Sequence, residues 1–114
     1  MLDIDLFKKY NDNFGHTAGD IVLKKISHII IDTLKDLHST VCRFGGEEFC
    51  VIIPGAQKDK ALELAQSIRK NIEKEKVVLR RQETFVTVSI GIAAFPIDGN
   101  DEDGLIKKAD KNMY

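Results

Sequence analysis

The stretch VCRFGGEEFCVII, residues 41–53, carries two apolar runs around Gly45-Gly46, with two carboxylates, Glu47 and Glu48, directly after the glycines. Two β-rich runs around a glycine pair are typical of a β-hairpin, because glycine adopts the positive φ angles that a type I′ turn needs. The apolar residues after the glycines occupy successive positions, which indicates a central strand covered on both faces. The sequence therefore predicts a buried hairpin with two acids at its tip.

The same turn predicts how the two cysteines of the chain lie. With Gly45 and Gly46 as the turn residues, three cross-strand pairs follow: Phe44 with Glu47, Cys42 with Phe49, and Val41 with Cys50. The sulfurs of Cys42 and Cys50 are then not directly opposed. We expect both to be buried thiols in a reducing cytoplasm.

Length and charge limit the possible classes of protein. The 114 residues fit one domain with a small core. Hydrophobic residues make up 43% and charged residues 31%, as in ordinary globular domains. The net charge of -1 gives no general attraction to nucleic acid or anionic lipid, and no apolar run approaches the roughly 20 residues that span a bilayer. We therefore expect no nucleic-acid partner and no membrane contact by this domain.

The rest of the chain alternates strand-like and helix-like patterns. Hydrophobic spacing and turn residues predict strands at 1–5, 76–79 and 84–95 and helices at 6–15, 18–36, 58–75 and 101–114. Thr17 and Asp20 resemble a capping box at the start of the second helix. The order strand, helices, hairpin, helix, hairpin, helix predicts an α/β sandwich of the ferredoxin-like kind, with a mixed or antiparallel sheet.

Three or four carboxylates are expected to lie near one another. Asp3 and Asp5 share one face of the first strand, and Glu47 and Glu48 lie at the hairpin tip. If the first strand lies beside the hairpin, these acids repel one another unless a cation lies between them, and such oxygen ligands suit Mg2+. Acids at strand ends are also often simply solvated, and a glycine pair can serve a turn alone. Spacing by itself leaves both readings open.

Four blocks of sequence then resemble one family. RFGGEEF (43–49) resembles the signature of the GGDEF family of diguanylate cyclases in its GGEEF form. DIDLFKKYNDNFGHTAGD (3–20), VTVSIGIA (86–93) and ADKNMY (109–114) resemble its other blocks, in the same order. The resemblance implies a palm-like fold related to nucleotide cyclases and polymerases. It also implies a nucleotidyltransferase reaction in which two GTP molecules condense to cyclic di-GMP and two pyrophosphates.

The resemblance assigns a metal site and a base site. Asp3 and Glu47, with the Ile4 carbonyl, would hold Mg2+, or alternatively Mn2+. Asn11 and Asp20 would bind guanine. Guanine presents an N1–H and an amine side by side, so a carboxylate can accept both hydrogen bonds, and an adenine edge would leave that acid poorly paired. Since capping and base binding need the same oxygens, the two roles of Asp20 compete.

The resemblance also assigns the phosphate contacts. Gly45 and Gly46 would lie beside the nucleotide, because missing side chains let a ligand approach the backbone. Leu6 and Phe7 would offer backbone N–H groups to the phosphates and Lys8 a positive charge. An exposed helix lysine is also commonly just solvated.

Glu48 has three possible roles in this site. It can act as a further metal ligand, as a catalytic proton acceptor, or as a partner for Arg43, which the expected turn places opposite it. The pairing with Arg43 is the favoured reading.

The resemblance extends over residues 1–114 but has departures. The chain is expected to lack the family's first helix and its C-terminal basic segment, and DLHS (36–39) stands where many members carry an inhibitory RxxD site. The implied active form is a cytoplasmic homodimer, controlled by sensor domains of the parent protein. The alternatives are a catalytically inactive module that binds GTP or dimerises, and a cyclase of relaxed base choice.

Overall fold

The computed structural model describes residues 1–113. Its elements are β1 (Leu2–Ile4), α1 (Phe7–Phe14), α2 (His16–Thr33), β2 (Thr40–Gly45), β3 (Glu48–Ile52), α3 (Lys58–Lys74), β4 (Val77–Leu79), β5 (Gln82–Thr84), β6 (Val88–Ile90) and α4 (Glu102–Met113). The predicted end of the last helix at Tyr114 lies outside the described residues. No helix in residues 1–113 is both long and apolar enough to cross a membrane.

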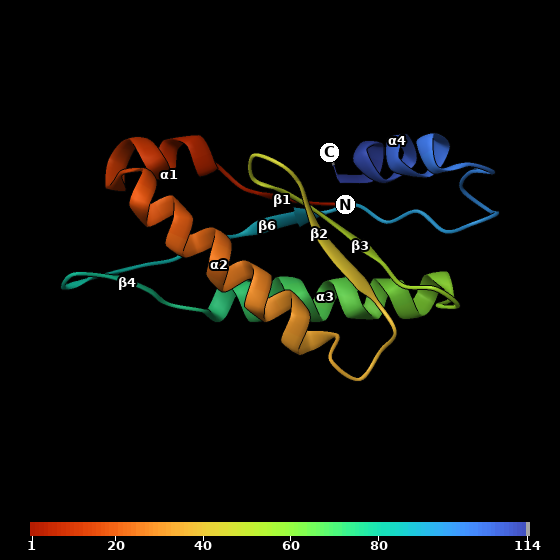
Figure 1. Cartoon of the computed structure of the whole chain (residues 1–114), viewed down its shortest axis with the longest axis horizontal. Coiled ribbons are helices and arrows are strands. Elements are labelled where there is room, and N and C mark those ends of the chain that lie inside the picture. The colour runs from red at the N-terminus through yellow and green to blue at the C-terminus, as the bar shows by residue number, and fades with distance from the viewer. Residues whose placement is uncertain (114) are drawn as a thin grey trace.

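One sheet organises the molecule (Figure 1). Its strand order is β2-β3-β1-β6 and its pairings are antiparallel, while β4 and β5 form a separate two-stranded sheet. In chain order the main sheet and its helices follow β-α-β-β-α-β, which is the ferredoxin-like arrangement. The predicted α/β fold with an antiparallel sheet flanked by helices is therefore confirmed.

The core lies between one face of this sheet and two helices. Leu2 and Ile4 of the short central strand β1 are only 2% and 1% exposed. They pack in one cluster with residues of α2 and α3, among them Ile26 and Ile72. Because strand side chains alternate between faces, burying Leu2 and Ile4 leaves Asp3 on the other face of β1.

The β2–β3 hairpin differs from the predicted one in its register. Gly45 pairs with Glu48, so the turn residues are Gly46 and Glu47. Arg43 pairs with Phe49 and Gly45 pairs with Glu48, so Phe44 has no partner in β3 and forms a β-bulge. The type I′ turn predicted at Gly45-Gly46 is wrong, because within residues 1–113 positive φ angles at glycine occur only at positions 15 and 55.

The shifted register corrects the predictions for the cysteines. Cys42 lies opposite Cys50, instead of Cys42 opposite Phe49 and Val41 opposite Cys50. Cys42 is exposed and Cys50 is half-buried, so the expectation of two buried thiols is also wrong. The cause is that β2 is an edge strand of the main sheet.

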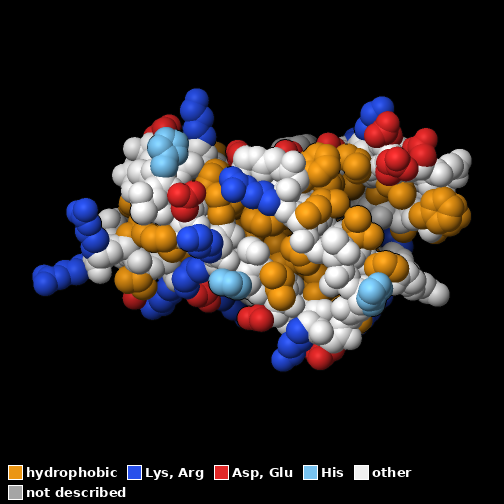
Figure 2. Space-filling model, viewed as in Figure 1, with side chains coloured by type: hydrophobic (Ala, Val, Ile, Leu, Met, Phe, Trp, Pro, Cys, Tyr) orange, Lys and Arg blue, Asp and Glu red, His pale blue; other side chains and the backbone are white. Residues whose placement is uncertain are grey.

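The hairpin is also less covered than its apolar sequence predicted. Phe44 is 52% exposed and Ile52 is 54% exposed. Figure 2 shows hydrophobic side chains gathered on the face of the molecule over this hairpin. A continuous apolar run therefore did not mark a strand covered on both faces.

The corner between α1 and α2 replaces the predicted capping box. Gly15, at φ 86°, ends α1 and also precedes the first residue of α2, His16. Its N–H donates to the Asn11 carbonyl at 2.7 Å, and its carbonyl accepts from Ala18 at 3.1 Å. Since α2 already begins at His16 without a side-chain cap, the prediction of Thr17 as the cap is wrong.

The segment predicted as one strand at 84–95 is divided between two sheets. Thr84 belongs to β5, whereas Val88 begins β6 in the main sheet. Thr84 is buried, its Oγ1 donates to the Val77 carbonyl at 3.1 Å, and the Tyr10 hydroxyl lies 2.7 Å from that Oγ1. The small β4–β5 sheet is thereby attached to α1.

Candidate functional site

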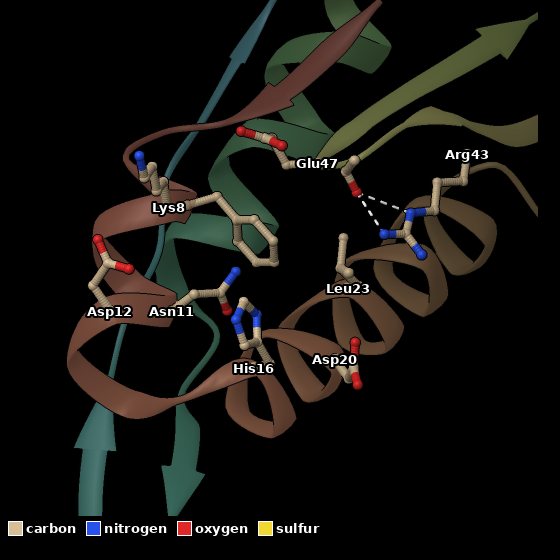
Figure 3. A pocket seen from close by; sticks show the side chains of 10 residues that line it. Lys8, Asn11, Asp12, His16, Asp20, Leu23, Arg43 and Glu47 are labelled. Carbon is tan, nitrogen blue, oxygen red and sulfur yellow. Dashed lines mark hydrogen bonds between the residues drawn. The ribbon is translucent and has the colours of Figure 1, made fainter.

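A cleft of about 620 Å³ opens between α1, the start of α2 and the tip of the β2–β3 hairpin. Figure 3 places Lys8 and Glu47 toward one end of this cleft and Asn11, His16 and Asp20 farther along it. The lining residues are Phe7, Lys8, Asn11, Asp12, His16, Asp20, Leu23, Arg43, Gly46 and Glu47. The corner at Gly15 folds α1 back against α2, so residues of both helices line one cavity.

Asn11 lines the cleft and carries an unpaired polar atom. Its Oδ1 is buried and lacks a hydrogen-bond partner among the described residues. A buried acceptor without a partner costs roughly 1–3 kcal/mol, and this one lies against Gly19 of α2, so the Asn11 amide gains if it turns to a donor in the cleft that the residue lines.

Gly19 of α2 allows Asn11 to occupy this place. A Cβ at position 19 would lie 2.9 Å from Asn11 Cγ, and closer still to Asn11 Oδ1. Glycine inside a helix costs roughly 1 kcal/mol relative to alanine. At position 19 this cost is offset by the room that glycine leaves for the Asn11 side chain. Sequence reasoning missed Gly19, and the signal available was a glycine within a helical pattern next to the candidate ligand Asp20.

Arg43 fixes the shape of the hairpin tip. Its Nε and Nη2 donate to the Gly46 carbonyl at 2.9 and 2.7 Å, as Figure 3 shows. The predicted pairing of Arg43 with Glu48 is wrong, because the bulge places Arg43 opposite Phe49 and Gly45 opposite Glu48. A two-pronged bond to one carbonyl holds the turn whose next residue is Glu47.

Asp3 and the acids of the hairpin lie close together, as expected. Asp3 is the Cα partner of Glu48 in the antiparallel pairing of β1 with β3. Burial raises the pKa of the Asp3 carboxyl above its ordinary value, and the charges of Glu47, Glu48 and Asp5 raise it further. Like charges held together in this way favour either a proton or a cation.

Asp5 has partners of its own. The hydroxyls of Thr87 and Ser89 donate to its two carboxylate oxygens at 2.6 and 2.7 Å. Those bonds occupy the Asp5 carboxylate, which leaves Asp3 and the hairpin acids as the candidate cation ligands.

The donor set fits a hard divalent cation that also binds a ligand. In residues 1–113 no three acid, histidine or cysteine side chains converge as a metal-binding group. The expected ligands, Asp3, Glu47 and the Ile4 carbonyl, are a smaller set of oxygen donors. Mg2+ is commonly held by one or two carboxylates together with substrate phosphates, so this smaller set suits it.

The segment between β1 and α1 has an uncommon backbone. Leu6 has a left-handed φ of 56° and its side chain is 74% exposed. Such a conformation in a residue other than glycine costs about 1–3 kcal/mol. It lets α1 begin directly after the strand, with the first-turn N–H groups, which lack intrahelical partners, near the acids of β1.

The structure divides the predicted site residues into two sets. The lining of the cleft includes Phe7, Lys8, Asn11, Asp20, Gly46 and Glu47. The other predicted residues, Asp3, Ile4, Leu6, Gly45 and Glu48, lie outside that lining, on β1, at its exit or beside the hairpin tip. Sequence reasoning gave no site role to Asp12, Leu23 or Arg43, which also line the cleft.

Comparison with known proteins supplies a family for this geometry. A family model described as "Diguanylate cyclase, GGDEF domain" matches residues 1–114. Diguanylate cyclase A of Treponema denticola is 37% identical over 114 residues, which are all of this chain and 30% of that protein. The chain therefore spans less than a third of that relative.

Solved structures agree in fold. The GGDEF domain of YfiN (TpbB) from Pseudomonas aeruginosa matches 99% of this chain and 70% of its own, with a TM-score of 0.91 and 35% identity. An active GGEEF domain of a diguanylate cyclase from Vibrio cholerae matches 99% of this chain and 70% of its own, with a TM-score of 0.89 and 27% identity.

Proposed function

The chain belongs to the GGDEF family of diguanylate cyclases, and on that premise we propose that its cleft binds one GTP and that two such chains condense two GTP to cyclic di-GMP and two pyrophosphates. The observation that carries the proposal is that Asn11, whose buried Oδ1 lacks a partner among the described residues, and Asp20 line the same cleft. A base with adjacent N–H donors is the ligand class that these two acceptors suit.

Guanine is bound at the end of the cleft lined by both helices. The Asp20 carboxylate, left without a capping role, accepts from guanine N1–H and the exocyclic amine. The Asn11 amide completes the hydrogen bonds along the base edge. Adenine presents an acceptor at N1 where guanine has an N1–H, so it would leave Asp20 poorly paired, and selection against ATP follows.

The triphosphate extends toward the hairpin tip and β1. Asp3, Glu47 and the Ile4 carbonyl would hold Mg2+ or Mn2+, which when bound polarises the phosphates and lowers the pKa of the attacking hydroxyl. Lys8 and the N–H groups of Leu6 and Phe7 face the phosphate charge, as free helix N–H groups can.

The hairpin tip supplies room and negative potential. A Cβ at Gly46 would meet no atom within 4 Å, so this glycine leaves open space over which the nucleotide lies, with Gly45 beside it. Glu48, opposite Asp3, adds negative charge that attracts the cation.

Two chains are required because each GTP 3′-hydroxyl attacks the α-phosphate of the other. The condensing arrangement is therefore a homodimer with two-fold symmetry, in which each chain orients one GTP. We place this domain in the cytoplasm, where GTP is present, under the control of sensor domains in the longer protein.

The test measures cyclic di-GMP formation and nucleotide binding with one set of variants. Glu47→Gln should abolish product formation from GTP and Mg2+, and Glu63→Gln on the exposed face of α3 is the matched control that should leave it unchanged. Asp20→Asn should lower GTP affinity at least tenfold and leave ATP affinity nearly unchanged, because each hydrogen bond to a charged group contributes about 1.5–3 kcal/mol. Asp32→Asn, on the exposed surface of the same helix, is its control.

The outcomes separate the proposed function from its alternatives. Product from the unchanged chain that is lost in Glu47→Gln supports the cyclase. Guanine-selective binding without product, also in the longer protein, supports a regulatory GTP-binding module instead. An unchanged ratio of GTP to ATP binding in Asp20→Asn contradicts the base assignment.

A further inference from the structure

Cys42 and Cys50 face each other across the β2–β3 hairpin. They are Cα partners in the antiparallel register, and both are free thiols. Directly opposed residues in such a pair have Cα atoms about 4.5–5.5 Å apart and side chains on one face. A disulfide requires a Cα separation of roughly 4.4–6.8 Å, so the hairpin can accept one without a change of register.

The bulge at Phe44 creates this opposition. In the regular turn expected at Gly45-Gly46, Cys42 would lie opposite Phe49, and Cys50 would lie opposite Val41. The extra residue in β2 shifts the strand by one position and brings the two thiols to the same rung. The opposition therefore depends on the hairpin as folded.

The Cys42 thiol already turns toward the other strand. Its Sγ donates to the Cys50 carbonyl at 3.6 Å. Burial raises the pKa of the Cys50 thiol, and the neighbouring Cys42 raises it further, which agrees with two sulfur groups close together. The Cys42 side chain thus already contacts Cys50 across the hairpin.

Access to the pair is unequal. Cys42 lies on the edge strand β2 and is exposed, while Cys50 lies on the interior strand β3 and is half-buried. A thiol reagent in solution therefore meets Cys42 first, and Cys50 is placed to react second.

We propose that Cys42 and Cys50 are a modification site, at which a reversible intramolecular disulfide forms by exchange with a low-molecular-weight disulfide. The Cys42 thiolate attacks one sulfur of R–S–S–R, which forms a mixed disulfide and releases RS⁻. The Cys50 thiolate then attacks Cys42 Sγ, which closes the protein disulfide and releases the second RS⁻. The two protein thiols lose two protons and two electrons, and R–S–S–R becomes two R–SH.

The bond would join the arms of the hairpin close to its tip. Only Arg43 and the bulged Phe44 separate Cys42 from the glycines, and the turn residues Gly46 and Glu47 line the cleft. A cross-link here prevents the arms from separating. It also removes unfolded conformations, so the oxidised chain should unfold at higher urea concentration than the reduced chain.

The experiment incubates the purified, reduced chain with oxidised glutathione and measures its intact mass. The expected product has lost the mass of two hydrogens and carries no glutathione. Trypsin cleaves after Arg43, between the cysteines, so the digest should contain peptide 36–43 linked to peptide 44–58, and excess reduced glutathione should release it.

Two variants and a gel keep the outcomes distinct. Cys50→Ser should stop at one glutathione on Cys42, and the doubly substituted chain should gain no mass. The proposal is overturned if the unchanged chain also stops at the glutathione adduct, or remains fully reduced, or if a non-reducing gel shows that the linked peptides come from two chains.

Discussion

Replacing Gly19 by alanine tests how α2 accommodates the Asn11 side chain. The added Cβ would lie 2.9 Å from Asn11 Cγ and 3.0 Å from Phe7 Cζ, so the Asn11 amide must leave its place against α2. Alanine in a helix interior gains about 0.8–1.0 kcal/mol over glycine, and releasing the buried, unpaired Oδ1 removes part of a cost of about 1–3 kcal/mol. These gains offset the displacement of Asn11 and Phe7.

We therefore expect stability and ligand binding to respond differently. The free energy of unfolding of Gly19→Ala should stay within about 1 kcal/mol of that of the unchanged chain. GTP affinity should fall about tenfold, because a hydrogen bond of about 1–1.5 kcal/mol to the base is lost. Urea unfolding and calorimetric titration with GTP and Mg2+ measure the two quantities.

A double-mutant cycle supplies the control. If Gly19 acts through Asn11, then Gly19→Ala, Asn11→Ala and the double variant should show nearly the same loss of GTP affinity. Unchanged affinity in Gly19→Ala, or losses that simply add in the double variant, would refute the reasoning.

Three further predictions concern stability. Asp3→Asn should raise the urea midpoint of unfolding at pH 7 and abolish product formation. Because the pKa of Asp3 is raised in the folded state, its negative charge destabilises the fold above about pH 4. The gain in stability should therefore vanish below that pH. A gain that persists at pH 3 would contradict this origin. Tyr10→Phe should cost about 1 kcal/mol in urea unfolding, because Thr84 Oγ1 loses a buried partner, whereas Tyr10→Leu should cost more through lost packing. The hydrogen bond from Lys58 holds the pKa of Asp98 below its ordinary value, so that bond stabilises the fold above about pH 4 and is lost as the pH falls further. Lys58→Met should therefore be less stable than the unchanged chain at pH 7 and equally stable at pH 2. An equal difference in stability at both pH values would refute the assignment.

Periodic features of the sequence predicted most of the fold. The helical spacing of residues such as Ile26 and Ile72 gave the helices that cover the sheet, because burial of one face is repeated over several turns. The alternation at residues 1–5 predicted a strand with Asp3 away from the core. The proximity of Asp3 to the hairpin acids also followed from the sequence.

Features that depend on single residues were not predictable in the same way. The bulge at Phe44 shifts the register by one position, and either register satisfies the apolar pattern of the arms. The corner at Gly15 makes the capping box unnecessary, although Thr17 and Asp20 have the right spacing for one. The relation of Gly19 to Asn11 depends on how two helices pack, which local sequence does not contain.

The two proposed metal ligands come from parts of the sheet with different local stability. Asp3 lies on β1, which has a strand on each side, whereas Glu47 lies in the turn that ends the edge strand β2. Amide hydrogens at a sheet edge exchange through small local openings, while those of a central strand await larger ones. Fraying of the hairpin would carry Glu47 away and leave Asp3 in place, so the fraction of time for which the metal site is assembled equals the fraction for which the hairpin is closed. The central strand thus provides the reference point, and the hairpin turn sets how often the site is complete.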